Sequence, residues 1–142
     1  MMKARFIEIP GEPIGKGRPR ACLRKGMPTV YTPSKTVDYQ AHVQECYKAQ
    51  CGAEMIPKGV PICLTVDAIF GLPKSASKRA QEKMLSGEER PTKKPDADNI
   101  LKIIADALNG LAWYDDAQIT SAHLAKAYGK TPCVRVWISE ED

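Results

Sequence analysis

The chain has 142 residues, a net charge of +4, 43% hydrophobic residues and 27% charged residues, which predicts one globular domain with a real core. No apolar run approaches the roughly 20 residues that span a bilayer, and Glu8, Pro10 and Glu12 interrupt any N-terminal signal sequence. We therefore expect a cytoplasmic protein. The five cysteines form no Cys-x-x-Cys pair, so free thiols are expected rather than a zinc site. A cysteine–histidine nucleophile stays open, although nothing in the sequence orients such a pair.

Positive charge is concentrated in two segments. Residues 1–36 contain eight lysines and arginines against two glutamates, and residues 74–94 contain seven against three, giving +6 and +4. Basic segments on either side of an acidic centre suit a phosphate backbone that is bound across carboxylates. The distribution favours a nucleic acid as the partner.

Residues 3–9 are predicted to form an opening strand, which Pro10-Gly11 ends. A loop follows up to Arg20, and it contains Gly15-Lys16-Gly17-Arg18-Pro19-Arg20. Its small residues would let the backbone approach a ligand closely, but the spacing does not fit a Walker-type phosphate loop. DNA contact by Lys16, Arg18 and Arg20 is the working hypothesis, and a solvated turn is the alternative.

Further elements follow in the middle and at the end of the chain. We expect a hairpin around Lys25-Gly26, a helix from a capping Ser34 to about Gln50, a strand over 60–70, a short basic helix over 73–85, and strands over 118–128 and 133–139. Asp67 is a possible extra site residue on its strand, although a surface acid is the simpler interpretation. The pattern predicts a mixed α/β (α+β) domain over residues 1–142, with one mixed sheet covered by helices.

The most strongly patterned helix begins after Pro95, with Asp98 or Asn99 as its expected cap. Asn109-Gly110 supplies the stop, with glycine at the left-handed position. Apolar residues recur at the spacing of a buried helical face, namely Ile100, Ile103, Ile104, Ala107, Leu108 and Leu111.

Acidic residues gather around this helix. Asp98, Asn99, Lys102 and Asp106 fall on the face opposite the isoleucines, and Asp98 and Lys102 are close enough to interact. Asp96 lies just upstream, near the positive end of the helix dipole. If the chain turns back after the helix, Asp115-Asp116 approach Asp96 and Asp98, which would make an all-oxygen site suited to Mg²⁺.

We therefore predict a Mg²⁺-dependent phosphodiesterase that acts on nucleic acid. Asp96, Asp98 and Asp116 are the expected metal ligands, with Asp115 the less favoured of its pair. Lys102 would stabilise negative charge on the phosphate or position the attacking water. Asp106 would orient Lys102 or serve only the structure. The competing interpretation is that the acids are a helix cap with first-turn residues and a turn.

The same segment resembles a known family. Lys93-Lys94-Pro95-Asp96-Ala97-Asp98-Asn99, Lys102, Asp106-Ala107-Leu108-Asn109-Gly110 and Trp113-Tyr114-Asp115-Asp116-Ala117-Gln118 are similar to the RusA family of Holliday junction resolvases. The Gly-Lys-Gly-Arg-Pro-Arg opening and Tyr31-Thr32-Pro33 are similar to its phage- or prophage-type branch. The resemblance runs from Gly15 to the final strand. The N-terminal third departs from the shorter founding member, which leaves DNA contacts and sequence preference open.

The resemblance implies a homodimer that binds four-way DNA junctions in recombination and repair. Such enzymes nick two opposing strands symmetrically and use Mg²⁺, for which Mn²⁺ is an expected substitute. Their essential acids match Asp96, Asp98 and Asp116, and their essential lysine matches Lys102. Lys93 and Lys94 join the residues expected to contact DNA. The alternatives are a non-catalytic junction-binding protein, a nuclease specific for flaps or forks, and an RNA-processing enzyme.

Overall fold

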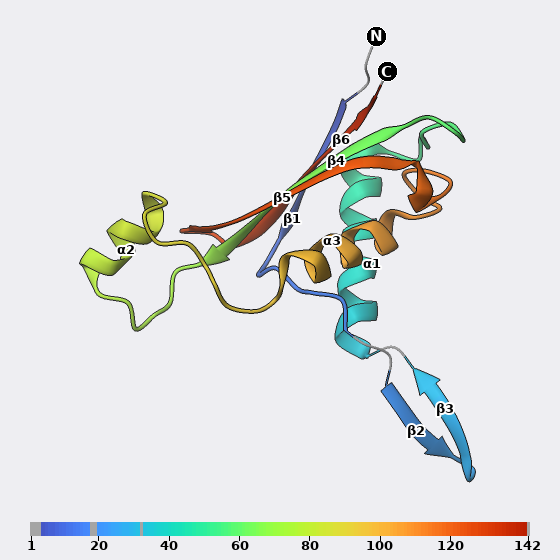
Figure 1. The fold of residues 1–142 in the computed structure, drawn as a ribbon, viewed down its shortest axis with the longest axis horizontal. Helices are drawn as coiled ribbons and strands as arrows, with labels where there is room; N and C mark the ends of the chain where they lie inside the picture. The colour runs from blue at the N-terminus through green and yellow to red at the C-terminus, as the bar shows by residue number, and fades with distance from the viewer. Residues whose placement is uncertain (1–3, 18–19, 32, 142) are drawn as a thin grey trace.

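The computed structural model of the chain describes residues 4–17, 20–31 and 33–141 (Figure 1). Its elements, in chain order, are β1 (Ala4–Pro10), β2 (Arg20–Arg24), β3 (Met27–Tyr31), α1 (Ser34–Cys51), β4 (Ile62–Gly71), α2 (Lys78–Leu85), α3 (Ala97–Leu108), the 3₁₀ helix η1 (Asp116–Gln118), β5 (Ile119–Gly129) and β6 (Cys133–Glu140). The predicted mixed α+β class is confirmed. Within the described ranges, no helix is both long and apolar enough to cross a membrane.

A four-stranded mixed sheet forms the centre of the fold, in the order β1-β6-β4-β5. β6 runs antiparallel to both β1 and β4, whereas β5 runs parallel to β4. A parallel pair needs a long crossover connection, and here that crossover contains α2, α3 and η1. The predicted catalytic residues Asp96, Asp98, Lys102 and Asp116 therefore all lie in this one connection between β4 and β5.

α1 and α3 cover one face of this sheet (Figure 1). Buried and half-buried residues alternate along β4, so one side of this strand faces the core. The predicted apolar face of α3 is confirmed, since Ile100, Ile103, Ile104, Ala107 and Leu108 are all fully buried. Burial of each of the larger side chains contributes about 1.5–3 kcal/mol. The amide Nε2 of Gln44 on α1 also donates to the Ala107 carbonyl oxygen at 3.1 Å.

The opposite face of the sheet leaves large side chains exposed. Phe6 on β1 and Trp137 on β6 are neighbours there, with ring centroids 5.1 Å apart and exposures of 44% and 37%. Asp67 belongs to this face, because Leu64, Val66 and Ala68 of the same strand point to the helices. Asp67 therefore lies on the side of the sheet away from α3 and does not join the acids there.

Two helix starts differ from the predictions. Ser34 is the first residue of α1 and Pro33 takes the cap position, where no side chain bonds the helix. α2 begins at Lys78 rather than near Pro73, because the Ser77 hydroxyl accepts a hydrogen bond from the Ala80 amide at 3.1 Å. A serine cap of this kind fixes where the first turn starts.

The end of α3 and the hairpin match the sequence. Gly110 adopts a φ of +78°, which is the left-handed conformation expected after a helix. In the β2–β3 hairpin, Lys25 and Gly26 have φ values of +52° and +75°, which is typical of a type I′ turn. β2 and β3 pair with each other in a separate two-stranded sheet that extends away from the central sheet, past the start of α1 (Figure 1).

Candidate active site

α3 begins with two exposed carboxylates. Asp96, not Asp98 or Asn99, occupies the cap position, and its side chain makes no capping hydrogen bond. Asp98 lies in the first turn. Neither carboxylate has a hydrogen bond or an ion pair with the described residues. Since the acids are not used to cap the helix, they remain available to a ligand, at the helix end that favours negative charge.

A shared ion pair lies further along the same helix. Lys102 Nζ is 3.2 Å from Asp106 Oδ1, and Lys16 Nζ is 2.9 Å from Asp106 Oδ2. Lys102 thus pairs with the acid one turn later and not with Asp98, the neighbour that helix spacing also brings within reach. Asp106 is only 20% exposed, so its charge is less screened by solvent and attracts both lysines strongly. Asp106 thus holds Lys102 in place, one of the two roles expected for it.

The Gly15-Lys16-Gly17 segment is built into the site. The Lys16 amide donates to the Asn99 carbonyl oxygen at 2.9 Å, and the Gly17 amide donates to Thr36 Oγ1 at 3.0 Å. A Cβ on Gly15 would lie 2.8 Å from Pro95 Cβ and 3.0 Å from Asn99 Cβ, so only glycine allows this close approach. The segment is therefore a strap across the start of α3 rather than a solvated turn.

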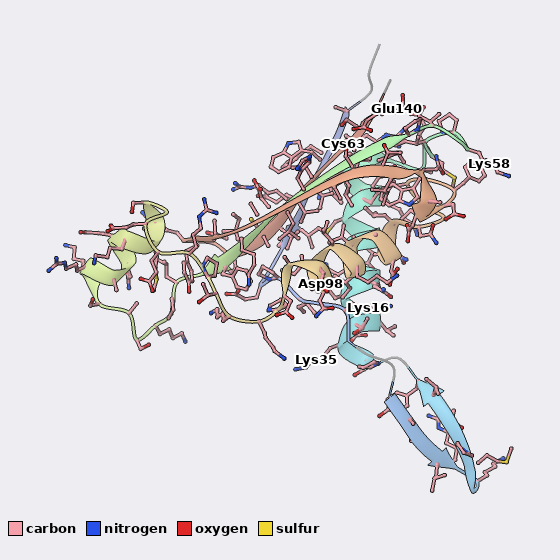
Figure 2. All side chains as sticks on the ribbon, in the orientation of Figure 1. Lys16, Lys35, Lys58, Cys63, Asp98 and Glu140 are labelled. Carbon is pink, nitrogen blue, oxygen red and sulfur yellow. The ribbon has the colours of Figure 1, made fainter. Side chains whose placement is uncertain are left out.

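A basic cavity opens between this strap and α3. It has a volume of about 400 Å³, and Lys16, Lys35, Lys94 and Asp96 are among the residues that line it. Figure 2 shows Lys16 and Lys35 in the same region as Asp98, where α1 and α3 begin. Lys35 was not among the predicted site residues, and its only signal in the sequence is its place in the basic N-terminal third. Three amines beside a carboxylate suit an anionic ligand that sits next to the acids.

Asp116 is held from the core. The indole Nε1 of Trp113, a fully buried side chain, donates to Asp116 Oδ1 at 2.8 Å. Burial raises the pKa of Asp116 above its usual value, and the negative charges of Asp106 and Asp115 add to this, while the Trp113 hydrogen bond and Lys102 oppose it. Asp116 therefore lies within electrostatic range of Lys102 and Asp106.

Asp115 has a structural role in the same turn. Its Oδ1 accepts from the Ala117 amide at 3.0 Å, and its own amide donates to Gln118 Oε1 at 3.1 Å. These two bonds form a capping box that starts η1. Gln118 is itself buried and donates to the Pro57 and Val60 carbonyl oxygens. Asp115 thus fixes the turn that orients Asp116.

The acids are not gathered into one ligand set. In the described part of the chain, no three acidic, histidine or cysteine side chains lie close enough together to hold a metal ion. The predicted convergence of Asp96, Asp98 and Asp116 is therefore not seen among the described residues; Asp116 is instead held by the Trp113 indole, in a turn that begins with the Asp115 cap. The donors themselves are carboxylate oxygens, which is the chemistry that Mg²⁺ prefers. The exposed side chains of Asp96 and Asp98 would have to turn toward Asp116 to form such a site.

The other predicted DNA-contacting residues differ in where the structure places them. Lys94 lines it. The Lys93 ammonium lies 5.7 Å from the Phe70 ring centroid instead, a distance at which cation–π attraction acts. Arg20 is the first residue of β2, and Arg18 lies outside the described residues.

A cysteine–histidine pair does occur, but it is not activated. Cys46 Sγ lies 4.0 Å from His42 Nδ1, and His42 Nε2 lies 3.0 Å from the Pro10 carbonyl oxygen. Burial raises the pKa of the Cys46 thiol, whereas a nucleophilic cysteine needs a lowered pKa. All five cysteines are free, as expected.

Asp106→Asn is expected to lower turnover about tenfold, as changes to residues that orient site groups commonly do. The amide cannot hold the two lysines as a carboxylate does, so Lys102 would lose its fixed position. Steady-state cleavage kinetics would show a lower kcat with a nearly unchanged KM, and Asp106→Glu should restore part of it. Equal turnover in Asp106→Asn and the wild type would show that Asp106 does not position Lys102.

The fold and this site define a small α+β domain that presents carboxylates and lysines together to an anionic ligand. Comparison with known proteins is consistent with this class. The sequence model of a family described as Endodeoxyribonuclease RusA matches residues 10–139. The uncharacterized protein YqaN of Bacillus subtilis (strain 168) is 38% identical over 132 residues, which cover 92% of each chain. The chain belongs to the RusA endodeoxyribonuclease family.

Proposed function

We propose that the protein is a Mg²⁺-dependent endodeoxyribonuclease that resolves four-way (Holliday) DNA junctions during recombination or repair. The observation that carries this proposal is the pair of exposed carboxylates, Asp96 and Asp98, which no described residue bonds, beside a cavity lined by Lys16, Lys35 and Lys94. A backbone phosphate in that cavity would be neutralised by the lysines and would lie next to the acids. Membership of an endodeoxyribonuclease family supports DNA as the nucleic acid.

Asp96, Asp98 and Asp116 are the proposed metal ligands. Bound Mg²⁺ would supply neutralisation of phosphate charge and a water of lowered pKa, and Mn²⁺ is expected to substitute for it. Asp96 and Asp98 are exposed and have no bond to a described residue, so they can turn toward a cation at little cost. Asp116 is held by the Trp113 indole, so its remaining carboxylate oxygen is the one available to a ligand.

Lys102 is proposed to stabilise the negative charge that develops on the phosphate, or to position the attacking water. Its link to Asp106 keeps the ammonium on the acid-bearing face of α3. Lys16, Lys35 and Lys94 would hold the DNA backbone on the cavity side, and Arg18, Arg20 and Lys93 would extend this contact. These residues bind and orient the substrate, while the acids and Lys102 act on the phosphodiester itself.

A homodimer is the proposed working unit. A four-way junction has approximate twofold symmetry and its resolution needs two opposed cuts, so two identical sites related by a twofold axis match it. Each protomer would then make one nick, and the paired nicks would leave ligatable ends.

The test compares a labelled four-way junction with a linear duplex of the same arm sequence, with Mg²⁺ or with EDTA. We expect paired symmetric nicks in the junction alone, abolished by EDTA and restored by excess Mg²⁺ or Mn²⁺. Binding without cleavage under any divalent ion would support a non-catalytic junction-binding protein instead. Faster cleavage of flap or fork substrates in direct competition would favour the structure-specific alternative.

A further inference from the structure

The β2–β3 hairpin has an apolar face that the described part of the chain leaves uncovered. In its antiparallel register, Ala21 lies opposite Val30 and Leu23 opposite Pro28, so these four side chains share one face. All four are exposed, Leu23 by 75% and Val30 by 70%. An isolated two-stranded hairpin is marginally stable in water, and exposed apolar surface of this kind commonly marks a binding site.

The hairpin also carries positive charge near its turn. Arg24 lies opposite Met27 on the second face, and Lys25 forms the turn. Residues 13–37 contain six lysines and arginines and no aspartate or glutamate. This charge is complementary to a phosphate backbone and repels a second copy of the same hairpin. Four side chains also cover far less than the roughly 800 Å² per partner of a stable protein interface. DNA therefore fits this surface better than a second copy does.

The chemistry of the apolar face fits bases that are not fully stacked. Leucine and proline are among the side chains that DNA-binding proteins insert between base steps, and Leu23 and Pro28, which belong to this face, lie close to the turn. An intact duplex hides its base faces by stacking, whereas stacking is interrupted at a branch point. The strap connects the hairpin to the site, because Lys16, which pairs with Asp106, is only four residues before Arg20.

We propose that the β2–β3 hairpin is a wedge that enters the branch point of the DNA substrate; this inference rests on the proposed function. Its apolar face would lie against unstacked bases, while Arg24 and Lys25 contact the adjoining phosphates. A five-residue strand such as β2 spans about 13 Å at about 3.3 Å per residue. The tip would thus reach roughly four base steps of about 3.4 Å. The wedge makes the branch, rather than the sequence, the feature that is recognised.

The test uses the double variant Leu23→Ser/Val30→Thr and a junction that carries 2-aminopurine at its branch point. Val37→Thr on α1 is the matched control, because Val37 is 50% exposed but lies outside the hairpin. The wild type and the control should raise 2-aminopurine fluorescence on binding, and the double variant should not. Its junction affinity should fall about tenfold, in the range expected for lost base contacts, with unchanged affinity for linear duplex at the same salt concentration.

A second substrate separates a lost wedge from a damaged protein. A junction whose central pairs are mismatched is already open, so the double variant should cut it at nearly the wild-type rate. An undiminished fluorescence rise and junction preference in the double variant would overturn the wedge. So would a change from dimer to monomer in sedimentation, which would assign the face to a second copy. If the wild type itself neither bound nor cut junctions, the proposed function would fall instead.

Discussion

Asp98→Asn is expected to reduce cleavage of a four-way junction by about a thousandfold, a loss on the scale of removing a principal group that stabilises the transition state. The amide keeps the size and shape of the side chain but loses the negative charge that a divalent cation requires. Asp98 lies exposed in the first turn of α3, without a bond to any residue that the structure describes. The variant should therefore fold normally, and its free energy of unfolding should fall by less than about 1 kcal/mol through the weakened helix-dipole interaction.

Two measurements make this result specific. Junction binding in the presence of Ca²⁺ should be unchanged, whereas calorimetric Mn²⁺ binding should weaken. Asp38→Asn is a suitable control, since Asp38 is an exposed acid in the first half of α1 and should cut like the wild type. If Asp98→Asn cut the junction at the wild-type rate, Asp98 would not be a ligand, and its place at the start of α3 would be explained by the helix alone.

Trp113→Phe is expected to affect both stability and chemistry. Phenylalanine keeps a ring in the core but lacks the indole N–H that donates to Asp116 at 2.8 Å. A hydrogen bond to a charged group is worth about 1.5–3 kcal/mol, so the free energy of unfolding should fall by about 2 kcal/mol. Trp113→Ala would cost about 3–5 kcal/mol because it also leaves a cavity. Cleavage by Trp113→Phe should fall about tenfold to a hundredfold as Asp116 loses its orientation.

The pH profile distinguishes lost orientation from general damage. The indole donor lowers the pKa of Asp116 while burial raises it, so removing the donor should raise this pKa further. The carboxylate would then be protonated at a higher pH, and the acid limb of the activity profile should shift upward. Trp137→Phe is the control, since Trp137 is half-exposed on the other face of the sheet. An unshifted acid limb in Trp113→Phe would remove Asp116 from the groups that control the reaction.

The secondary structure followed from local patterns in the chain. Alternation along 60–70 located β4, the isoleucine spacing located the buried face of α3, and Lys25-Gly26 located a hairpin turn. Each of these signals is strong because one periodicity or one backbone conformation leaves few alternatives. The cap of α1 differs from the pattern by one residue, because Pro33 and not Ser34 occupies the cap position.

The arrangement of the site could not be predicted from the sequence, because residue spacing does not tell which of several possible partners a side chain contacts. Asp98 and Asp106 are both one turn from Lys102, and Lys102 pairs with Asp106, the less exposed of the two acids, which Lys16 of the strap also reaches. The position of Asp116 depended on a buried indole three residues before it. Lys35 lines the cavity only because the strap and α1 meet beside α3. In each case the deciding partner is remote in the chain or hidden in the core.

The ion pairs of Asp106 join two segments of the chain that can change independently of each other in evolution. The acids and Lys102 belong to the crossover between β4 and β5, which is anchored on the core, whereas the strap and hairpin precede α1. Exchange of the hairpin between relatives would therefore alter which DNA shapes are accepted and leave the hydrolytic groups in place. Such an exchange would have to keep only two residues of the strap. Position 15 must be glycine, because a Cβ there would lie 2.8 Å from Pro95 Cβ, and position 16 must be the lysine that pairs with Asp106. Recognition can thus diversify in this fold without redesign of its chemistry.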